Sequence, residues 1–275
     1  MAKIAYGRPV ADSILNELKE SYSTYFPKAN PCFFQVGNNP ASNIYVANKV
    51  KLCEKLGMVP RIVKLGSKVS EEILCDELRK YSANPCMLQL PLPEGLNKQR
   101  CLDSIELDID GLTTKNKAKL YTGQEAIVPC TAKAVLDIFN FYQYDVKGKV
   151  IMVAGKSDLV GKPLIYLLLA KGATVVSINS KTPIEKTIEL LKTTDALITA
   201  IGIPKFFKPE YFTKDIQFIV DVGISKLEDG TISGDVDSEV IKTLSDNTYI
   251  TPVPKGVGVI TVANVLYNII KSLRI

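Results

Sequence analysis

Short runs of apolar residues alternate with stretches of helical periodicity along most of the chain. The continuous apolar runs predict strands, because a strand of a parallel sheet is buried on both faces. We expect strands at residues 32–37, 58–65, 86–90, 149–155, 173–178, 195–202 and 218–223. Helical patterns lie between them, notably at residues 42–55, 69–82, 161–171 and 183–193. Strands that alternate with helices predict an α/β fold with parallel sheets and crossover helices.

The alternation of strands and helices is denser in the second half of the chain, which indicates a second domain. We expect a boundary within residues 120–145, where the helical pattern TAKAVLDIFNFY precedes the turn YDVKGK. The last segment, ITVANVLYNIIKSL (260–273), is amphipathic. We expect this segment to return and pack on the first domain.

Composition places the chain among ordinary globular proteins. Of its 275 residues, 46% are hydrophobic and 23% are charged. The net charge of +5 is mild, and the basic residues are interspersed with acidic ones, which favours a solvated surface over a nucleic-acid interface. No apolar run approaches the roughly 18 residues of a membrane span, and the start MAKIAYGRPVADSI does not resemble a secretory signal. We therefore expect a cytoplasmic protein that binds neither membranes nor nucleic acid.

The chain contains six cysteines and no histidine, and both facts restrict its chemistry. No CxxC pair occurs, so a zinc site or a disulfide framework is not expected, and we predict no metal. Without histidine, Ser-His-Asp and Cys-His catalysis are excluded. Proton transfer must therefore use Lys, Asp, Glu, Tyr, Cys or water.

The stretch MVAGKSDLVGKP (152–163) contains the letters GKS, which also end a P-loop. A P-loop requires a glycine five residues before Gly155, where this chain has Val150. The alternative is a strand, a glycine turn at Gly155 and a helix N-terminus near Gly161, a unit that binds a pyrophosphate. The spacing GxSxxxG is not GxGxxG, so a β-turn-α unit without a ligand is an equal alternative on this motif alone.

The segment after the next predicted strand refines the choice of cofactor. NAD sites usually place an acidic residue there, on the ribose hydroxyls. This chain instead has Asn179, Ser180 and Lys181. Together with Lys156 and Ser157, these residues favour the 2′-phosphate of NADP.

The first half of the chain holds several polar residues at positions suited to a site. Tyr45 and Lys49 are four residues apart, hence neighbours on one helix face, although the spacing alone favours an exposed lysine beside a half-buried tyrosine. Gln89 ends a predicted strand, where ligands bind in open parallel sheets. Asp110 precedes a glycine and is also typical of a plain turn. The stretch TPVPKGVGVIT (251–261) is a second possible cradle for a ligand.

Taken in order, the motifs are far more specific than any one of them. The series YVxxK, QLPLP, DxDG, PCT, GxSxxVGxP, SxT, DVGI, GDVD and TPVPxGVG resembles the FolD family over residues 7 to 270. These are bifunctional methylenetetrahydrofolate dehydrogenase/methenyltetrahydrofolate cyclohydrolases. The resemblance implies two α/β domains with the folate in the cleft between them, and a homodimer.

The resemblance also implies an activity and its cofactor. The activity is NADP-dependent oxidation of 5,10-methylenetetrahydrofolate, followed by hydrolysis to 10-formyltetrahydrofolate, in one-carbon metabolism. The implied domains are residues 1–120 plus 255–275 for folate binding and catalysis, and a Rossmann-type, doubly wound domain at 121–254 for NADP. A monofunctional NAD(P)-dependent dehydrogenase on the same fold is the alternative.

Residue roles follow from the same resemblance. Lys49 corresponds to the catalytic lysine, Tyr45 to the tyrosine that packs on the folate and holds the lysine, and Gln89 to the glutamine that tunes it. Asp110 corresponds to the aspartate that binds the amino edge of the pterin, and it completes the implied catalytic set. The implied substrate-binding residues are Tyr45, Lys49, Leu88, Gln89, Leu90, Asp110, Pro254, Gly256 and Gly258. The implied cofactor-binding residues are Gly155, Lys156, Ser157, Ser180 and Ile224.

The sequence departs from the family pattern at a few positions. Lys156 replaces the arginine of the cofactor turn, and because lysine lacks the guanidinium fork, a weaker grip on phosphate is expected. The other departures are Leu107, Ala132, Asn179, Lys255, Val259 and Ile260.

Overall fold

The computed structural model describes residues 1–212 and 216–274, and these form two compact units. Unit 1 comprises Met1–Asp12 and Thr131–Thr261, and unit 2 comprises Ser13–Cys130 and Val262–Ile275. Each unit is an α/β structure built on its own parallel sheet, as predicted.

Unit 1 contains a six-stranded sheet with the order β1-β12-β9-β8-β6-β7, in which every pairing is parallel. The chain runs from β6 to β7 at one edge and then crosses to β8 on the other side, which is the doubly wound arrangement predicted. The strands are β1 (Lys3–Ile4), β6 (Val150–Ala154), β7 (Thr174–Ile178), β8 (Ala196–Thr199), β9 (Phe218–Asp221) and β12 (Tyr249–Ile250).

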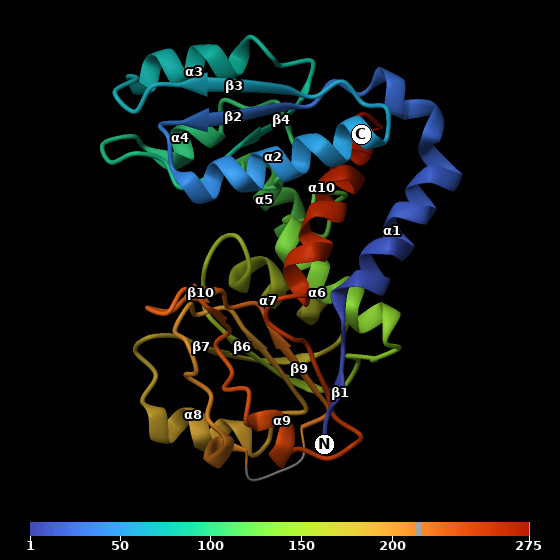
Figure 1. Cartoon of the computed structure of the whole chain (residues 1–275), viewed down its shortest axis with the longest axis vertical. Coiled ribbons are helices and arrows are strands. Elements are labelled where there is room, and N and C mark those ends of the chain that lie inside the picture. The colour runs from blue at the N-terminus through green and yellow to red at the C-terminus, as the bar shows by residue number, and fades with distance from the viewer. Residues whose placement is uncertain (213–215, 275) are drawn as a thin grey trace. The chain divides into compact units, whose positions relative to one another are not determined.

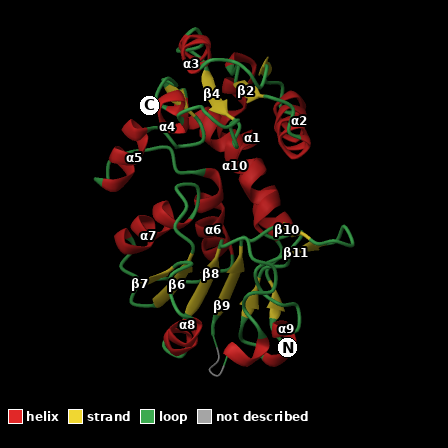
Figure 2. Ribbon diagram, turned by 90° about the vertical axis from the view of Figure 1, so that its left-hand side faces the viewer, coloured by secondary structure: helices red, strands yellow, loops and turns green. Residues whose placement is uncertain are grey.

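Helices cover both faces of this sheet. Figures 1 and 2 show α6 (Cys130–Phe141) and α7 (Gly161–Ala170) on one face, and α8 (Ile184–Leu191) and α9 (Val240–Thr243) on the other. The central strands β8 and β9 are buried along their whole length, which explains their uninterrupted apolar sequence. A short antiparallel hairpin, β10 (Ser225–Lys226) and β11 (Ile232–Ser233), and the 3₁₀ turn η2 (Pro209–Tyr211) complete the described elements of the unit.

Unit 2 contains a four-stranded parallel sheet with the order β3-β2-β4-β5. Its strands are β2 (Cys32–Val36), β3 (Arg61–Leu65), β4 (Pro85–Leu88) and β5 (Leu107–Asp108). Its helices are α2 (Pro40–Lys55), α3 (Glu71–Arg79), α4 (Lys98–Leu102) and α5 (Thr114–Tyr121), with η1 (Ser23–Lys28) after α1. Two further helices, α1 (Gly7–Tyr22) and α10 (Val257–Ser272), have residues in both units.

Side-chain caps set the starts of the helices in unit 2. Asn39 accepts a hydrogen bond from the Ser42 N–H at 3.1 Å, and Pro40 occupies the first turn of α2. Ser70, Asn97 and Thr113 cap α3, α4 and α5 in the same way. The start of α2 is therefore fixed by local sequence, and this helix carries Tyr45 and Lys49.

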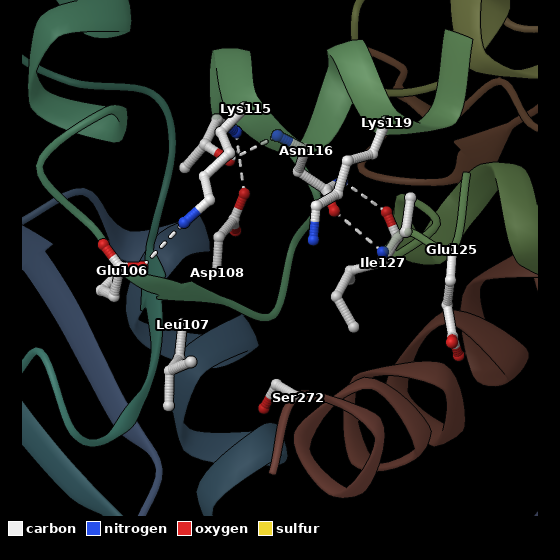
Figure 3. Close-up of a pocket in the computed structure, with 11 residues that line it drawn as sticks. Glu106, Leu107, Asp108, Lys115, Asn116, Lys119, Glu125, Ile127 and Ser272 are labelled. Atoms are coloured by element: carbon white, nitrogen blue, oxygen red, sulfur yellow. Dashed lines mark hydrogen bonds and ion pairs between the residues drawn. The ribbon is translucent and has the colours of Figure 1, made fainter. Parts of the chain in front are cut away.

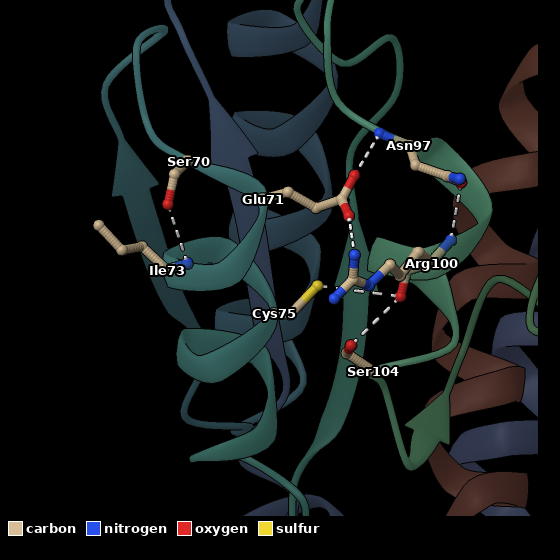
Figure 4. Close-up of polar contacts among 7 residues, drawn as sticks. All are labelled: Ser70, Glu71, Ile73, Cys75, Asn97, Arg100 and Ser104. Atoms are coloured by element: carbon tan, nitrogen blue, oxygen red, sulfur yellow. Dashed lines mark hydrogen bonds and ion pairs between the residues drawn. The ribbon is translucent and has the colours of Figure 1, made fainter.

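Polar contacts join α3 and α4 at the surface of unit 2 (Figure 4). The Glu71 carboxylate accepts from the Asn97 N–H at 2.7 Å and pairs with the Arg100 guanidinium at 2.7 Å. The Arg100 side chain is 60% exposed, so this ion pair stabilises the fold only weakly. Most of the stability comes from the apolar cluster beneath, which includes Phe34, Leu74, Leu78 and Leu102.

The seven predicted strands are all confirmed and are shorter than predicted, although β4 begins one residue earlier than predicted, at Pro85. The return of the last segment is also confirmed, because Asn268 of α10 donates hydrogen bonds to the carbonyls of Ile109 and Val128. All six cysteines are buried and unpaired. Across the described residues, no helix has both the length and the apolar character needed to cross a membrane.

The division into units differs from the predicted domain ranges at the N-terminus and at both later boundaries. Residues 1–12 belong with unit 1 because β1 pairs with β12 of the six-stranded sheet. The later boundaries lie at Thr131 and Thr261 instead of 121 and 255, and Ile275 lies outside the described residues.

Candidate active site

Lys49 lies at the centre of a polar cluster in unit 2. Its Nζ donates to the Gln89 Oε1 at 2.9 Å and lies 3.1 Å from the Met87 Sδ. The Gln89 Nε2 in turn donates to the Leu90 carbonyl at 2.7 Å, so the amide oxygen is the end that faces the lysine. Helix α2 and the end of strand β4 thus bring the amine and the amide together.

Two neighbouring charges tune each other in this cluster. Burial lowers the pKa of Lys49, and the nearby Asp110 carboxylate opposes this shift. Burial raises the pKa of Asp110 to about 6, against the effect of Lys49. A larger fraction of Lys49 is therefore in the neutral amine form near neutral pH than for a lysine in water.

The loop that carries Asp110 is wrapped around the side chain of Asp108. The Asp108 carboxylate accepts backbone hydrogen bonds from residues 110, 111, 112 and 113 at 2.5 to 3.0 Å. Burial raises the pKa of Asp108, and these four N–H groups oppose the shift. Gly111 has φ +75°, and a Cβ there would lie 2.6 Å from the Ile127 carbonyl, so the turn requires glycine.

Cys130, at the start of α6, is the third member of the cluster. Its thiol donates to the Ile109 carbonyl at 3.8 Å, and its side chain lowers the pKa of the neighbouring Asp110. Burial raises the pKa of Cys130 well above its ordinary value, so the thiol stays protonated and can donate. Its sulfur also lies 3.3 Å from the Asn268 Nδ2.

Tyr45 lies one helical turn before Lys49, with 48% of its surface exposed. In the described part of the chain, no hydrogen bond joins its hydroxyl to the lysine. The exposed ring is a free surface on which a flat ligand can stack.

Leu88 and Leu90 point away from Lys49. Side chains alternate along a strand, so Met87 and Gln89 share the face toward the amine and Leu88 takes the other. Leu88 is 1% exposed and lies in the apolar core, and Leu90 packs against that core. The side chains of Leu88 and Leu90 therefore belong to the apolar core and not to the Lys49 cluster.

In unit 1, the turn after β6 packs so closely against neighbouring backbone that two of its positions have no room for a side chain. Gly155 has φ +116°, and a Cβ there would lie 2.6 Å from the Ala200 carbonyl. A Cβ on Gly161 would overlap with the Gly155 carbonyl. Both glycines are therefore required for α7 to start against the strand.

A cavity of about 280 Å³ opens beside this turn. Four of the five predicted cofactor residues line it, namely Gly155, Lys156, Ser157 and Ser180. Ile224 does not line it. Its Cδ1 is instead the atom nearest to Gly258, 4.0 Å from where a Cβ would stand.

Pro254 and Gly256 lie in the loop that precedes α10, and Gly258 lies in the first turn of that helix, all in unit 1. A Cβ on Gly256 would overlap with the Pro252 carbonyl, whereas Gly258 has room for one. Lys255 has φ +83°, a left-handed conformation that is uncommon for lysine. The predicted site residues thus divide between the units. Tyr45, Lys49, Leu88, Gln89, Leu90 and Asp110 belong to unit 2, and the predicted cofactor residues belong to unit 1 together with Pro254, Gly256 and Gly258.

Sequence reasoning missed three residues of the cluster, namely Met87, Asp108 as a loop anchor, and Cys130. Strand alternation is a signal that places Met87 beside Gln89. Asp108 stands two residues before Asp110, within reach of an Asx-type turn. Local sequence carries no signal for Cys130, because its contact with Asp110 is a tertiary one.

Comparison with known proteins agrees with this geometry. Residues 5–110 match the family model of the tetrahydrofolate dehydrogenase/cyclohydrolase catalytic domain, and residues 129–275 match that of its NAD(P)-binding domain. The bifunctional protein FolD of Enterococcus faecalis is 34% identical over 283 residues, which covers 100% of this chain and 99% of that protein.

Two solved structures extend the comparison. The crystal structure of the bifunctional FolD enzyme of Campylobacter jejuni superposes with a TM-score of 0.92 at 33% identity, over 100% of this chain and 99% of that one. The Trypanosoma brucei enzyme, complexed with NADP and an inhibitor, has a TM-score of 0.90 at 29% identity, over 99% and 97% of the chains.

Proposed function

The chain belongs to the FolD family of tetrahydrofolate dehydrogenase/cyclohydrolases, and from this premise we propose that it makes 10-formyltetrahydrofolate in two steps. The first step oxidises 5,10-methylenetetrahydrofolate to the methenyl cation. The second adds water to that cation and opens the ring. The observation that carries this proposal is the contact of Lys49 with Gln89, beside the Asp110 carboxylate.

Unit 2 supplies the folate site in this proposal. The exposed ring of Tyr45 stacks on the folate, and the Asp110 carboxylate accepts hydrogen bonds from the amino edge of the pterin. Lys49 takes up and returns the proton that water releases when it attacks the cation. Gln89 holds the amine in place through its oxygen. This chemistry needs a lysine whose pKa lies below its usual value, and burial provides it.

Unit 1 supplies the NADP site. NADP, when bound, accepts the hydride that leaves the one-carbon bridge. The residues present fit such a group, because the turn has no side chain at Gly155, which lines the cavity, or at Gly161, where α7 begins. Lys156 and Ser180 line the same cavity and supply a cation and a hydroxyl for the 2′-phosphate. Pro254, Gly256 and Gly258 are proposed to close over the substrate, and Ile224 to contact the cofactor.

A monofunctional dehydrogenase does not need the hydrolytic lysine. The retained contact between Lys49 and Gln89 therefore favours the bifunctional enzyme. The family description, which includes cyclohydrolase activity, favours it as well.

We also propose that the enzyme is a cytoplasmic homodimer. The six buried free cysteines are typical of a reducing compartment. The dimer is proposed from the family resemblance. Sedimentation equilibrium of the purified chain tests it, and a mass near 30.2 kDa at micromolar concentration would reject it.

Two assays on the purified chain test the proposed function. NADP reduction is followed with methylenetetrahydrofolate, and loss of the methenyl chromophore is followed without NADP. We expect both activities in the wild type. Substitution Lys49→Met is expected to lower the cyclohydrolase kcat by at least about 100-fold, since general acid–base catalysis contributes about that much.

The outcomes separate the alternatives. A wild type active only in the first assay is the monofunctional enzyme, and a wild type inactive in both contradicts the proposal. Near-normal hydrolysis by the Lys49→Met variant removes Lys49 from the proton transfer. Lys51→Met, an exposed lysine on the same helix, is the matched control and is expected to keep both activities.

A further inference from the structure

Asn268 of α10 is a buried amide whose donors point at the backbone beside Asp110. Its side chain is 1% exposed. Its Nδ2 donates to the Ile109 carbonyl at 3.0 Å and to the Val128 carbonyl at 2.9 Å. Ile109 directly precedes Asp110, and Val128 stands two residues before Cys130. One amide therefore links the two loops that present the carboxylate and the thiol of the cluster.

A second asparagine joins the same two loops on the far side of Gly111. The Asn116 Nδ2 donates to the Gly111 carbonyl at 3.1 Å. It also donates to the Ile127 carbonyl at 2.6 Å, and the Asn116 Oδ1 accepts from the Ile127 N–H at 2.8 Å (Figure 3). Asp108 satisfies the N–H groups of the Asp110 loop from within. The Ile109 carbonyl accepts from the Asn268 Nδ2 at 3.0 Å and, over a longer distance of 3.8 Å, from the Cys130 thiol.

The other end of the Asn268 amide indicates why the residue is there. Its Oδ1 is buried and, among the described residues, has no hydrogen-bond partner. A buried acceptor without a partner destabilises the fold, and an apolar side chain of similar size would avoid that cost in a helix that served packing alone. The amide thus has a use in its donors, and these hold the loops of Asp110 and Cys130.

We propose that Asn268 is a positioning residue for the folate reactions, and that it acts by fixing Asp110 and Cys130 relative to Lys49. This inference rests on the proposed function. Asp110 is held by hydrogen bonds to the backbone on both of its sides, and loss of the Asn268 donors removes the shorter hydrogen bond to the Ile109 carbonyl that precedes it. A carboxylate that is free to shift loses directional hydrogen bonds to the substrate before it loses the fold.

Substitution Asn268→Leu in the full chain tests the proposal, because leucine keeps the approximate size and removes both donors. We expect the KM for methylene- and methenyltetrahydrofolate to rise about tenfold, and the KM for NADP to stay within twofold. Asn268→Ser keeps one donor and is expected to give an intermediate KM. Thermal unfolding of each variant shows whether it is folded, and if the leucine variant is not, the serine variant decides.

Asn264→Leu is the matched control. Asn264 is equally buried on the same helix, and its Nδ2 donates to the Cys130 carbonyl at 3.4 Å. We expect it to lose stability with a smaller change in folate KM. The proposal is overturned if the folded Asn268 variants keep the wild-type folate KM, or if Asn264→Leu raises it equally. A wild type without either activity refutes the proposed function instead, so the two failures are distinct.

Discussion

Lys49 illustrates how a single side chain is tuned by two opposing effects. Burial removes water from the ammonium and lowers its pKa, while the Asp110 carboxylate stabilises the charge and raises it. The same pair acts in reverse on Asp110, whose pKa rises to about 6 because burial outweighs the lysine. The protonation of the amine therefore depends on whether Asp110 carries its charge.

Substitution Asp110→Asn is expected to move the acid limb of the cyclohydrolase pH profile to lower pH. Loss of the carboxylate removes an effect that raises the pKa of Lys49, so the neutral amine persists further into acid. The measurement is kcat at saturating methenyltetrahydrofolate from pH 5.5 to 8.5, corrected for spontaneous hydrolysis. Glu54→Gln removes an exposed carboxylate from α2, the helix that carries Lys49, and controls for the change in net charge. A limb that stays in place or moves to higher pH contradicts the coupling.

The site residues that could be predicted from sequence are those whose place in the fold is set by their spacing within one helix or strand. Tyr45 and Lys49 are four residues apart on a capped helix, and Gln89 directly follows strand β4, at the carboxyl end where ligands bind in parallel sheets. Asn268 could not be found in this way, because its contact with Cys130 spans 138 residues of sequence. Such contacts depend on how α10 packs, and no local pattern encodes that.

At the scale of elements, the β6–α7 unit depends on two glycines for different reasons. Gly155 adopts a positive φ, whereas Gly161 is required because its neighbour is the Gly155 carbonyl. The helix can start beside the strand only while both positions lack a side chain. This explains why the glycines matter although their spacing differs from GxGxxG.

Substitution Gly161→Ala is expected to raise the KM for NADP about tenfold, since overpacking costs about 1–3 kcal/mol and 1.4 kcal/mol is a factor of ten. Cyclohydrolase activity, measured without NADP, should change less than twofold. Gly66→Ala is the control, because a Cβ there meets no atom within 4 Å and its φ is not positive. An unchanged KM for NADP would show that α7 does not position the cofactor.

Element length decided which elements the hydrophobic pattern could predict. Buried strands of four or five residues, such as β8 and β9, stand out as apolar runs. Strands β1, β5 and β12 have two residues each and show no period. Helix α1 was not predicted, yet its buried residues Val10, Ile14 and Leu18 recur every four positions, which is a helical signal.

At the scale of the molecule, the same limit explains why the two compact units differ from the predicted domain ranges. Residues 1–12 join unit 1 through the two-residue strand β1, which is too short to be read from sequence. The six-stranded sheet of unit 1 is therefore complete only when β1, from the start of the chain, pairs with β12, from near its end. Its stability is a property of the whole unit.

Two buried carboxylates hold the ends of strands in this sheet. Asp221 accepts from the N–H groups of Gly223, Asp235 and Val236 at 2.9 to 3.1 Å. Asp235 accepts from Thr199 and from the backbone beyond it. Burial raises the pKa of Asp221 to about 7, and the Asp235 charge adds to the shift, while the backbone donors oppose it.

This arrangement predicts that Asp221 makes unfolding easier as pH rises toward 7. The folded pKa of about 7 lies above the ordinary value of 3.8, so between these values the folded state binds more protons than the unfolded state. Stability from this group is therefore complete below about pH 4 and lost as pH rises to 7. One pKa unit corresponds to about 1.4 kcal/mol, so the range from pH 5 to 7 removes at most about 3 kcal/mol, or several degrees of Tm.

The measurement that isolates this effect is the Tm of the wild type minus that of Asp221→Asn, followed from pH 5 to pH 8. The asparagine loses part of the hydrogen bonding at every pH, which adds a constant offset, whereas the ionisation adds a slope. We expect the difference to fall up to about pH 7 and then to level off, because the carboxylate is fully charged above its folded pKa. The exposed Asp246→Asn in the same unit should give no slope. A flat difference for Asp221→Asn would mean that the carboxylate is already ionised in the folded protein at pH 5, and that its three backbone donors outweigh its burial.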